Sequence, residues 1–260
     1  MEHRNSAEVE RDIQMTKIDV VLLPEEVKDR DISDFLVVLI DVLRASSTIT
    51  TALAEGAKKI IPVFSPEEAR QRAEDYHPGL VLLGGERNGE KLPGFDLGNS
   101  PLEYRSQKIK NKIILLSTTN GVKAINQVTK AKKIIIGCFL NIQAVIQYCQ
   151  SYSKGVLLVC AGNRGSVSLE DTVCAGMIKY IVEGNNKQVD PNYPYHHDDA
   201  LVACQMYLKF KDDLFHMLKT SSWGKHLRAM GLEEDLIFCA QENIYHKIPV
   251  MKNNSIVIDD

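Results

Sequence analysis

Several kinds of segment are absent from this 260-residue chain, and each absence narrows the class of protein. No apolar run approaches the roughly 20 residues that a membrane-spanning helix needs, and residues 1–17 lack the apolar core of a signal peptide. The net charge is -3 and no basic run stands out, so nucleic acid is not an expected partner. We therefore expect a cytoplasmic globular protein that binds neither membrane nor nucleic acid.

The six cysteines form no C-x-x-C pair, and most of them lie among apolar neighbours. In a cytoplasmic protein, such residues are more often small buried side chains than metal ligands or disulfides. Arg164 follows Cys160 by only four positions, so the C-x5-R loop of cysteine phosphatases is absent as well. The cysteines are therefore expected to be buried and unpaired.

Common phosphate-binding signatures are also missing. The chain has no G-x-x-x-x-G-K-[ST] loop and no G-x-G-x-x-G, which argues against P-loop and dinucleotide-binding proteins. Val42 and Leu43 follow Asp41, where a haloacid-dehalogenase phosphatase would have a second aspartate two positions on. The sequence therefore disfavours all three families.

Short apolar runs do alternate with amphipathic segments from residue 35 to about 182. The runs predict strands at 35–40, 59–63, 80–83, 112–116, 133–136 and 155–160. Three serines precede an acidic residue at the spacing of a helix capping box: Ser65 and Glu68, Ser100 and Glu103, Ser168 and Asp171. Gly56 and Gly184 are placed as helix stops. This alternation predicts a layered α/β fold with a largely parallel sheet.

After Gly184 the pattern changes to a polar loop and then to helical segments. Helices are expected near 198–209, 211–219, 222–229 and 232–240, followed by a terminal hairpin of 248–251 and 255–258. The run from His196 to Asp199 resembles a metal motif, but adjacent residues point in different directions, so we interpret it as a helix start. No linker interrupts the chain, so we expect a flexible tail over residues 1–17 and a single domain over 18–260.

Polar and charged residues follow most of the predicted strands. They are Asp41 and Arg44, Gly84–Arg87, Ser117–Gly121, Asn141 and Ala161–Gly165. In open α/β sheets, ligands bind at the carboxyl ends of the strands. Carboxylates suit a hard metal ion, guanidinium groups suit an oxyanion, and glycines let backbone N–H groups approach an anion. This edge is therefore predicted to bind an anionic ligand together with a metal.

The same residues also have ordinary structural interpretations. Asp41 could pair with Arg44 and do nothing else, and Glu86 with Arg87 could form a solvated turn. Residues 118–121 could only cap a helix, and 170–171 could only be first-turn acids that complement a helix dipole. Their recurrence on one predicted edge favours a binding site.

Seven short motifs, in this order along the chain, resemble those of the 2-phosphosulfolactate phosphatases of the ComB type. They are Ile40–Ala45, Gly84–Arg87, Pro93–Pro101, Thr118–Gly121, Phe139–Asn141, Cys160–Gly162 and Leu169–Thr172. The similarity covers about residues 35–180 and continues more weakly toward 250. It implies a three-layer α/β/α sandwich that uses Mg²⁺ to hydrolyse (R)-2-phospho-3-sulfolactate to 3-sulfolactate and phosphate.

The chemistry of the residues agrees with this resemblance, and on it we base a hypothesis for the role of each residue. Catalysis is expected to involve Asp41, Arg44, Glu170 and Asp171, and Mg²⁺ to bind Asp41, Glu86 and Asp171. Either Glu170 or Asp171 would be the further metal ligand or base. Substrate binding is expected from Arg87, Asn99, Thr118, Thr119, Asn120, Asn141 and Arg164. Attack by water is favoured over a phosphoaspartyl intermediate on Asp41.

Two alternatives to this function stay open. One is a metal-dependent phosphatase of another phosphorylated hydroxy acid, which would use the same edge. The other is a non-catalytic anion-binding protein on the same scaffold. In each case the expected partner is a small anionic molecule. The sequence leaves open a homodimer and whether sulfolactate would feed coenzyme M synthesis.

Overall fold

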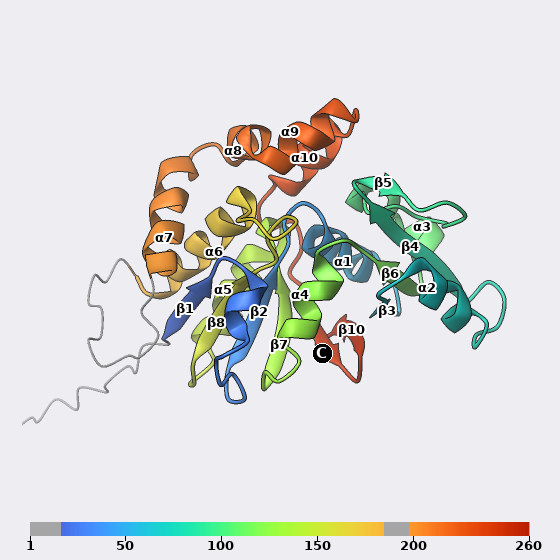
Figure 1. Cartoon of the computed structure of the whole chain (residues 1–260), viewed down its shortest axis with the longest axis horizontal. Coiled ribbons are helices and arrows are strands. Elements are labelled where there is room, and N and C mark those ends of the chain that lie inside the picture. The colour runs from blue at the N-terminus through green and yellow to red at the C-terminus, as the bar shows by residue number, and fades with distance from the viewer. Residues whose placement is uncertain (1–16, 185–197, 260) are drawn as a thin grey trace, which may run out of the picture.

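The computed structural model describes residues 17–184 and 198–259, in which ten strands form one mixed sheet (Figure 1). The strands are β1 (Ile18–Val21), β2 (Leu36–Ile40), β3 (Lys59–Pro62), β4 (Val81–Arg87), β5 (Glu90–Lys91), β6 (Ile113–Ser117), β7 (Lys133–Gly137), β8 (Val156–Cys160), β9 (Pro249–Lys252) and β10 (Ser255–Ile258). Their order across the sheet is β1-β8-β2-β7-β9-β10-β3-β6-β4-β5.

Helices connect most of these strands and cover both faces of the sheet (Figure 1). They are α1 (Ala45–Ala54), α2 (Pro66–Ala73), α3 (Ser106–Ile109), α4 (Gly121–Gln127), α5 (Ile142–Gln150), α6 (Leu169–Val182), α7 (Asp198–Phe210), α8 (Leu214–Thr220), α9 (Ser222–Ala229) and α10 (Glu233–Cys239). Three 3₁₀ turns complete the described part: η1 (Pro24–Val27), η2 (Pro101–Glu103) and η3 (Phe139–Asn141).

Strand β2 shows why the protein has three layers. Leu36, Val38 and Ile40 point into the core that the sheet shares with α5, α6 and the C-terminal helices. Val37 and Leu39 point the other way, into the core shared with α1 and α4. Because successive side chains of a strand face opposite sides, an entirely apolar strand needs a helical layer on each face. The α/β/α sandwich that the resemblance implied is confirmed.

Two groups of parallel strands make up the sheet, and the terminal hairpin joins them. One group is β1, β8, β2 and β7, and the other is β3, β6 and β4. Strand β9 runs antiparallel to β7, β10 runs antiparallel to β9, and β3 runs antiparallel to β10. Because of these three reversals, the strands of the two groups run in opposite directions. Figure 1 shows the β3–β6–β4 group turned strongly against the other, with the carboxyl ends of both groups toward α10. The mostly parallel, mixed sheet is therefore confirmed, and the strand ends that were expected on one edge come from two converging groups.

Two of the three predicted helix caps are confirmed. The side chains of Ser65 and Ser168 accept hydrogen bonds from backbone N–H groups at the starts of α2 and α6. Ser100 caps nothing and precedes only the 3₁₀ turn η2. Its hydroxyl instead donates to Asp235 Oδ1 at 2.5 Å, a long-range contact that the local sequence pattern does not reveal.

All six predicted strands and the terminal hairpin are present, while β1 and β5 were not predicted. Strand β4 extends to Arg87 and turns back into β5 through Asn88 and Gly89, whose φ angles are 55° and 90°. A two-residue Asn-Gly turn of this kind is the favoured connection of a tight hairpin. The β4–β5 hairpin places Glu86 beside the other strand ends.

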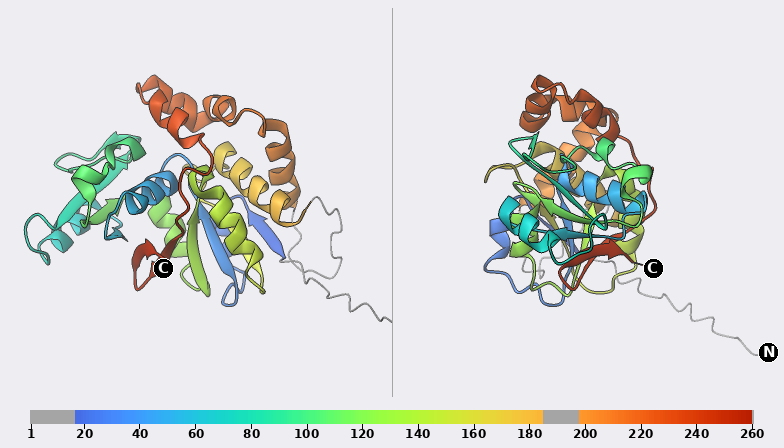
Figure 2. Two further views of the ribbon diagram at one scale, coloured as in Figure 1. Left: turned by 180° about the vertical axis from the view of Figure 1, so that it is seen from behind. Right: turned by 90° about the vertical axis from the view of Figure 1, so that its right-hand side faces the viewer.

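The helical segments predicted after residue 197 are confirmed as α7 to α10. Helix α7 packs beside α6 and β1, and α8 to α10 lie across the carboxyl ends of the strands (Figure 2). The expected tail lies outside the described residues except for Lys17, as do the polar loop from residue 185 and the His196-His197 pair. Across the described ranges, every helix is too short or too polar to cross a membrane.

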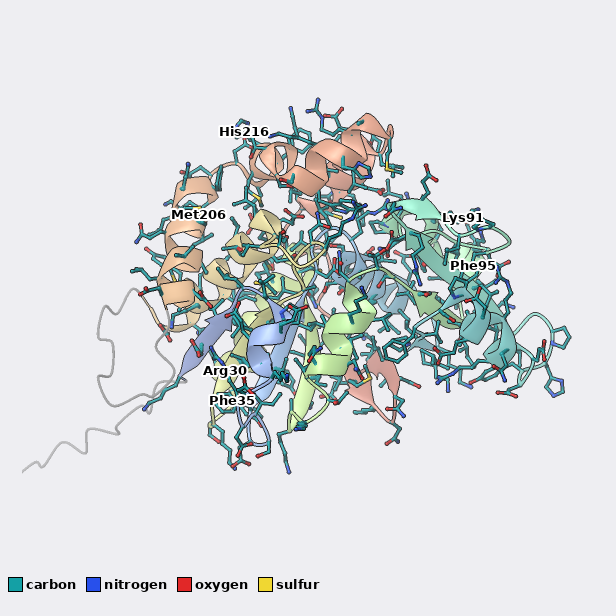
Figure 3. All side chains as sticks on the ribbon, in the orientation of Figure 1. Arg30, Phe35, Lys91, Phe95, Met206 and His216 are labelled. Atoms are coloured by element: carbon teal, nitrogen blue, oxygen red, sulfur yellow. The ribbon has the colours of Figure 1, made fainter. Side chains whose placement is uncertain are left out.

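A small hollow lies at the opposite ends of the strands, lined by Asp19, Arg30 and Phe35 among others. Figure 3 labels Arg30 and Phe35 at this end, far from the C-terminal helices. The six cysteines are all unpaired and, except for the half-buried Cys204, buried. Burial raises the pKa of all six thiols, so their side chains stay protonated near neutral pH.

Candidate active site

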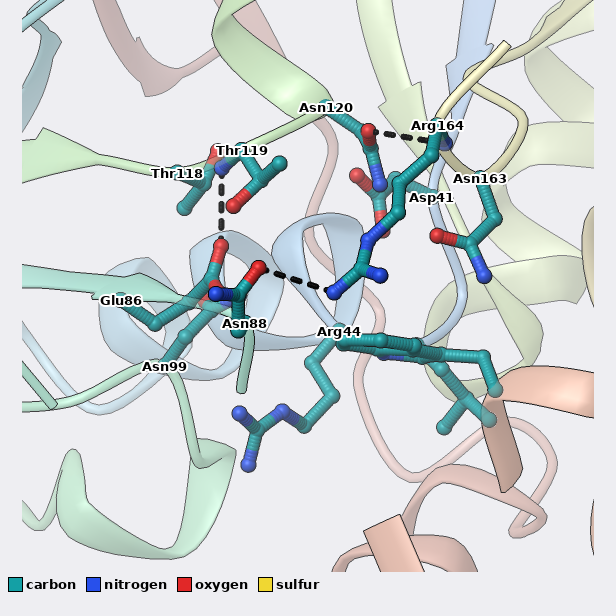
Figure 4. A pocket seen from close by; sticks show the side chains of 12 residues that line it. Asp41, Arg44, Glu86, Asn88, Asn99, Thr118, Thr119, Asn120, Asn163 and Arg164 are labelled. Atoms are coloured by element: carbon teal, nitrogen blue, oxygen red, sulfur yellow. Dashed lines mark hydrogen bonds between the residues drawn. The ribbon is translucent and has the colours of Figure 1, made fainter. Parts of the chain in front are cut away.

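A small pocket, open to solvent, lies where the carboxyl ends of the two strand groups meet (Figure 4). Its walls come from the loops after β2, β4, β6 and β8, from the segment before η2, and from α9. The lining residues are Asp41, Leu43, Arg44, Glu86, Asn88, Asn99, Thr118, Thr119, Asn120, Asn163, Arg164 and Trp223. Eight of the residues predicted for the site are therefore brought together.

Asp41 follows β2 directly and is buried. Its Oδ1 accepts a hydrogen bond from the N–H of Ala45 at 3.2 Å. The pKa of Asp41 is raised to about 7, mainly by burial. The charges of Glu86 and Glu170 act in the same direction, whereas the Ala45 N–H and the Arg44 guanidinium oppose the shift. A buried carboxylate among other carboxylates is best stabilised in its charged form by a cation.

Glu86 is the second carboxylate of the pocket, and the backbone holds both of its oxygens. Oε1 accepts from the N–H of Thr119, and Oε2 accepts from the N–H of Gly89, each at 2.8 Å. The contact with Thr119 connects the loop after β4 to the loop after β6 (Figure 4). Each carboxylate oxygen keeps a second lone pair, so Glu86 remains able to bind a metal ion.

Arg44 is fully enclosed at the start of α1. Its Nη1 donates to Asp235 Oδ2 at 2.6 Å, and its Nη2 donates to the carbonyl of Gly89 at 2.8 Å. Both terminal nitrogens therefore already bind the protein and do not form a free donor fork for phosphate. The ion pair is with Asp235 and not with Asp41, and Nε is the one nitrogen of this guanidinium without a protein partner.

The loop after β6 contributes Thr118, Thr119 and Asn120. Asn120 does not cap α4; its Oδ1 accepts from the backbone N–H of Arg164 at 3.3 Å. A Cβ on Gly121 would lie 3.3 Å from Asp41 Oδ2 and 2.9 Å from Cβ of Ala45. Gly121 thus lets the start of α4 approach Asp41 closely.

Four buried side-chain atoms in the described part of the chain have no hydrogen-bond partner. They are Arg44 Nε, Asn99 Oδ1, Thr119 Oγ1 and Asn163 Oδ1. All four belong to residues that line this pocket. Since an unpaired buried polar atom is costly, four of them around one pocket indicate a binding site for a polar ligand.

Glu170 and Asp171 are buried at the start of α6, but neither lines the pocket. Asp171 accepts from the N–H of Val42 at 2.8 Å and from the N–H of Gly162 at 3.2 Å. It therefore connects the loops after β2 and β8. Burial raises the pKa of Asp171 well above its usual range, and the charges of Asp41 and Glu170 act in the same direction. Burial also raises the pKa of Glu170.

Two predicted substrate-binding residues, Arg87 and Asn141, lie outside the pocket lining. Arg87 follows Glu86 in β4 and so faces the other side of the strand, where its guanidinium binds Ser117 and the carbonyl of Phe64. The Asn141 side chain accepts from the Cys138 N–H and donates to two carbonyls. These placements correct both predictions, because each side chain is already used in holding the backbone.

The pocket also contains residues that the sequence did not indicate, namely Leu43, Asn88, Asn163 and Trp223. Arg164 reaches across the pocket to Asn88, with Nη2 2.8 Å from Asn88 Oδ1 (Figure 4). Its guanidinium carbon lies 5.6 Å from the centre of the Trp223 ring. The Asn-Gly turn could have indicated Asn88, whereas no local signal distinguishes Trp223 from a packing residue.

The donor set of the pocket fits a hard divalent cation. Asp41 and Glu86 supply carboxylate oxygens, and Asn99 supplies an unpaired amide oxygen. Mg²⁺ is commonly bound through one or two carboxylates and several waters. Among the residues that the structure describes, no three His, Cys, Asp or Glu side chains are grouped closely enough to hold a metal alone. A site with two carboxylates is compatible with that finding, whereas a third carboxylate from Asp171 has no such support.

The fold and this pocket define an α/β enzyme of the phosphomonoester hydrolase class, with carboxylates and anion donors at converging strand ends. The chain belongs to the 2-phosphosulpholactate phosphatase family, whose model matches residues 21–254.

Three relatives illustrate the similarity, and each is named a probable 2-phosphosulfolactate phosphatase. The protein of Symbiobacterium thermophilum is 41% identical over 221 residues, which cover 85% of this chain and 93% of the relative. That of Caldanaerobacter subterraneus subsp. tengcongensis is 38% identical over 231 residues, covering 88% and 93%. That of Thermotoga petrophila is 40% identical over 223 residues, covering 86% and 92%. The range that the family model matches includes every residue that lines the pocket.

Proposed function

We propose that this protein hydrolyses (R)-2-phospho-3-sulfolactate to 3-sulfolactate and phosphate, with Mg²⁺ as its cofactor. The observation that supports this most is the gathering of four unpaired buried atoms around one pocket with two carboxylates. Family membership supports the choice of substrate. Phosphomonoester hydrolysis is among the slowest uncatalysed reactions, so a site for it must neutralise charge strongly.

Asp41 and Glu86 would hold the metal, and Asn99 Oδ1 would accept from a water in its shell. When bound, Mg²⁺ supplies charge neutralisation at the phosphoryl oxygens and lowers the pKa of an attacking water. The raised pKa of Asp41 is consistent with this role, because a carboxylate that is destabilised alone gains most from a nearby cation.

Donors of the chain itself would bind the anionic groups of the substrate. Arg44 Nε–H and the Thr119 hydroxyl are buried and unpaired in residues that line the pocket, so each would gain its missing hydrogen-bond partner from a phosphoryl oxygen. Arg164 is exposed, and its contact with Asn88 can exchange for one with the carboxylate or sulfonate. Thr118 and Asn120 complete the wall beside the phosphate.

Catalytic roles for Glu170 and Asp171 stay predictions. Neither residue lines the pocket, so a base of this pair would have to act through the loops that Asp171 connects. Water attack stays the favoured route over a phosphoaspartyl intermediate. Borohydride added during turnover would reduce a phosphoaspartyl intermediate on Asp41 and so trap it. If water attacks the phosphoryl group directly, no such intermediate forms and borohydride has no effect.

A substrate panel tests the proposal directly. Phosphate release is measured with synthetic (R)-2-phospho-3-sulfolactate and with 2-phospholactate, each with and without Mg²⁺. We expect kcat/KM for phosphosulfolactate to be at least about 10-fold higher, because a charged group without its partner weakens transition-state binding. Equal rates would favour a phosphatase of another hydroxy acid, and binding without turnover would favour a non-catalytic anion-binding protein.

A further inference from the structure

A buried acid outside the pocket, Asp235 in α10, connects two parts of the pocket wall that are far apart in sequence. Its side chain is 2% exposed, and each of its oxygens has a separate partner. Oδ2 accepts from Arg44 Nη1 at 2.6 Å, and Oδ1 accepts from the Ser100 hydroxyl at 2.5 Å. Arg44 lines the pocket, and Ser100 directly follows Asn99, which also lines it.

The contacts of Arg44 hold its guanidinium at both terminal nitrogens. Nη1 donates to Asp235 and Nη2 donates to the Gly89 carbonyl, while Nε, in a residue that lines the pocket, is buried without a partner. A planar guanidinium that is held at both terminal nitrogens has a fixed orientation, so the direction of its unpaired Nε–H is fixed as well. Without Asp235, the buried cation would lose its counter-charge and its orientation.

Asp235 acts on Asn99 through Ser100. The Ser100 hydroxyl caps no helix. Its hydrogen bond to Asp235 instead fixes the position of the segment before η2. The backbone carbonyl of Asn99 is held from the other side by the Thr48 hydroxyl at 2.8 Å. These two contacts keep the unpaired Asn99 Oδ1 at the pocket.

We propose that Asp235 is a positioning residue of the active site, which aligns Arg44 Nε–H and the Asn99 segment toward the ligand without touching it. The inference rests on the proposed function, and it assigns part of the site to the C-terminal helices. Asp235 is separated from Arg44 by 191 residues, so the helix α10 has to be docked before the pocket can bind an anion.

The test compares Asp235→Asn with Glu234→Gln, a matched change at the exposed neighbouring acid. We expect Asp235→Asn to lower kcat/KM for phosphate release about 10- to 100-fold, and Glu234→Gln to leave it unchanged. Equal activities of the two variants would overturn the proposal. Ser100→Ala is the alternative variant if Asp235→Asn folds poorly. It removes one contact of Asp235 and no charge, so its loss in kcat/KM should be smaller than that of Asp235→Asn.

A merely structural role is distinguished by chemical rescue. Guanidinium ion at low millimolar concentration should restore part of the activity of Arg44→Ala, because Asp235 and the Gly89 carbonyl would orient it. The rescue should be lost in the double variant Arg44→Ala/Asp235→Asn. Rescue of equal size in both backgrounds would show that Asp235 does not position the guanidinium.

Binding of inorganic phosphate keeps the inference testable if the proposed substrate fails. Calorimetric titration with phosphate, with Mg²⁺ present, requires no turnover. We expect Asp235→Asn to weaken binding about 10-fold relative to wild type and to Glu234→Gln. Unchanged phosphate affinity in Asp235→Asn would contradict the positioning role, whatever substrate the wild-type enzyme proves to hydrolyse.

Discussion

At the scale of single residues, the site is defined by charge that the fold buries before any ligand arrives. Asp41, Glu86, Glu170 and Asp171 are all buried, and Arg44 already has its own partner in Asp235. Such an excess of buried carboxylates is unfavourable for folding and favourable for binding a cation. We therefore expect these buried carboxylates to lower stability when no cation is bound, and a bound cation to restore it.

The pKa of Asp41 makes this cost measurable. Its folded-state value of about 7 lies above the ordinary value of 3.8, so the folded protein binds the proton more tightly than the unfolded chain. The stability that protonation contributes is fully present below about pH 4 and is lost as the pH rises through about 7. Without divalent cations, the melting temperature should therefore fall between pH 4 and pH 7.

Asp41→Asn should flatten this fall, because an amide does not titrate. A residual slope is expected from Asp171 and Glu170, whose pKa values burial also raises. Thermal melts in EDTA at several pH values would show the difference. The same slope in wild type and Asp41→Asn would mean that Asp41 does not carry the buried charge.

At the scale of elements, the β4–β5 hairpin matters because its turn supplies contacts to two site residues. Gly89 donates its N–H to Glu86 and accepts from Arg44 through its carbonyl. Its φ of 90° favours glycine, and a Cβ there would lie 2.9 Å from the sulfur of Met230. A short turn between two strands thereby fixes a carboxylate and a guanidinium together.

Gly89→Ala should destabilise the fold by about 1–3 kcal/mol and reduce phosphate release at the same time. Gly79→Ala is the matched control, because Gly79 has a similar φ of 82° and no atom within 4 Å of the added Cβ. It should cost a comparable free energy of unfolding and leave activity intact. Urea unfolding and the phosphate assay on both variants check this; equal activity in the two would remove the turn from the site.

At the scale of the whole molecule, the pocket exists because the terminal hairpin joins two groups of strands of opposite sense. Val250 of β9 belongs to the core with β2 and α6, whereas Ile256 of β10 belongs to the core with α1 and β6. One residue pair connects the hairpin to each group. The last strands of the chain therefore hold together the two halves of the active site.

Ile256→Ala tests this joint. Ile256 is fully buried, so the truncation should cost about 2–5 kcal/mol of unfolding free energy and lower activity under mild denaturant. Val257→Ala, at the next and only partly buried position, should cost clearly less. Equal losses for both variants would mean that the hairpin is held by its own pairing and not by the core.

Much of this arrangement could be predicted from local pattern, and the remainder could not. Apolar runs predicted the strands, and Asp41 and Glu86 were found because they stand at strand ends. The face on which Arg87 lies could not be predicted, because it depends on how far β4 extends. Trp223 and Asp235 come from helices whose docking is decided by packing over nearly two hundred residues, and no spacing in the sequence reports it.

The most direct test of the account is Mg²⁺-dependent phosphate release by wild type, Asp41→Asn, Glu86→Gln and the exposed control Glu90→Gln. If both buried carboxylates bind one magnesium ion in this pocket, each site variant should lose at least about 100-fold in kcat/KM, and Glu86→Gln should need more Mg²⁺ for its residual activity. Glu90→Gln should match wild type in rate and in Mg²⁺ dependence. Unchanged activity and unchanged Mg²⁺ dependence in Glu86→Gln would contradict the central claim.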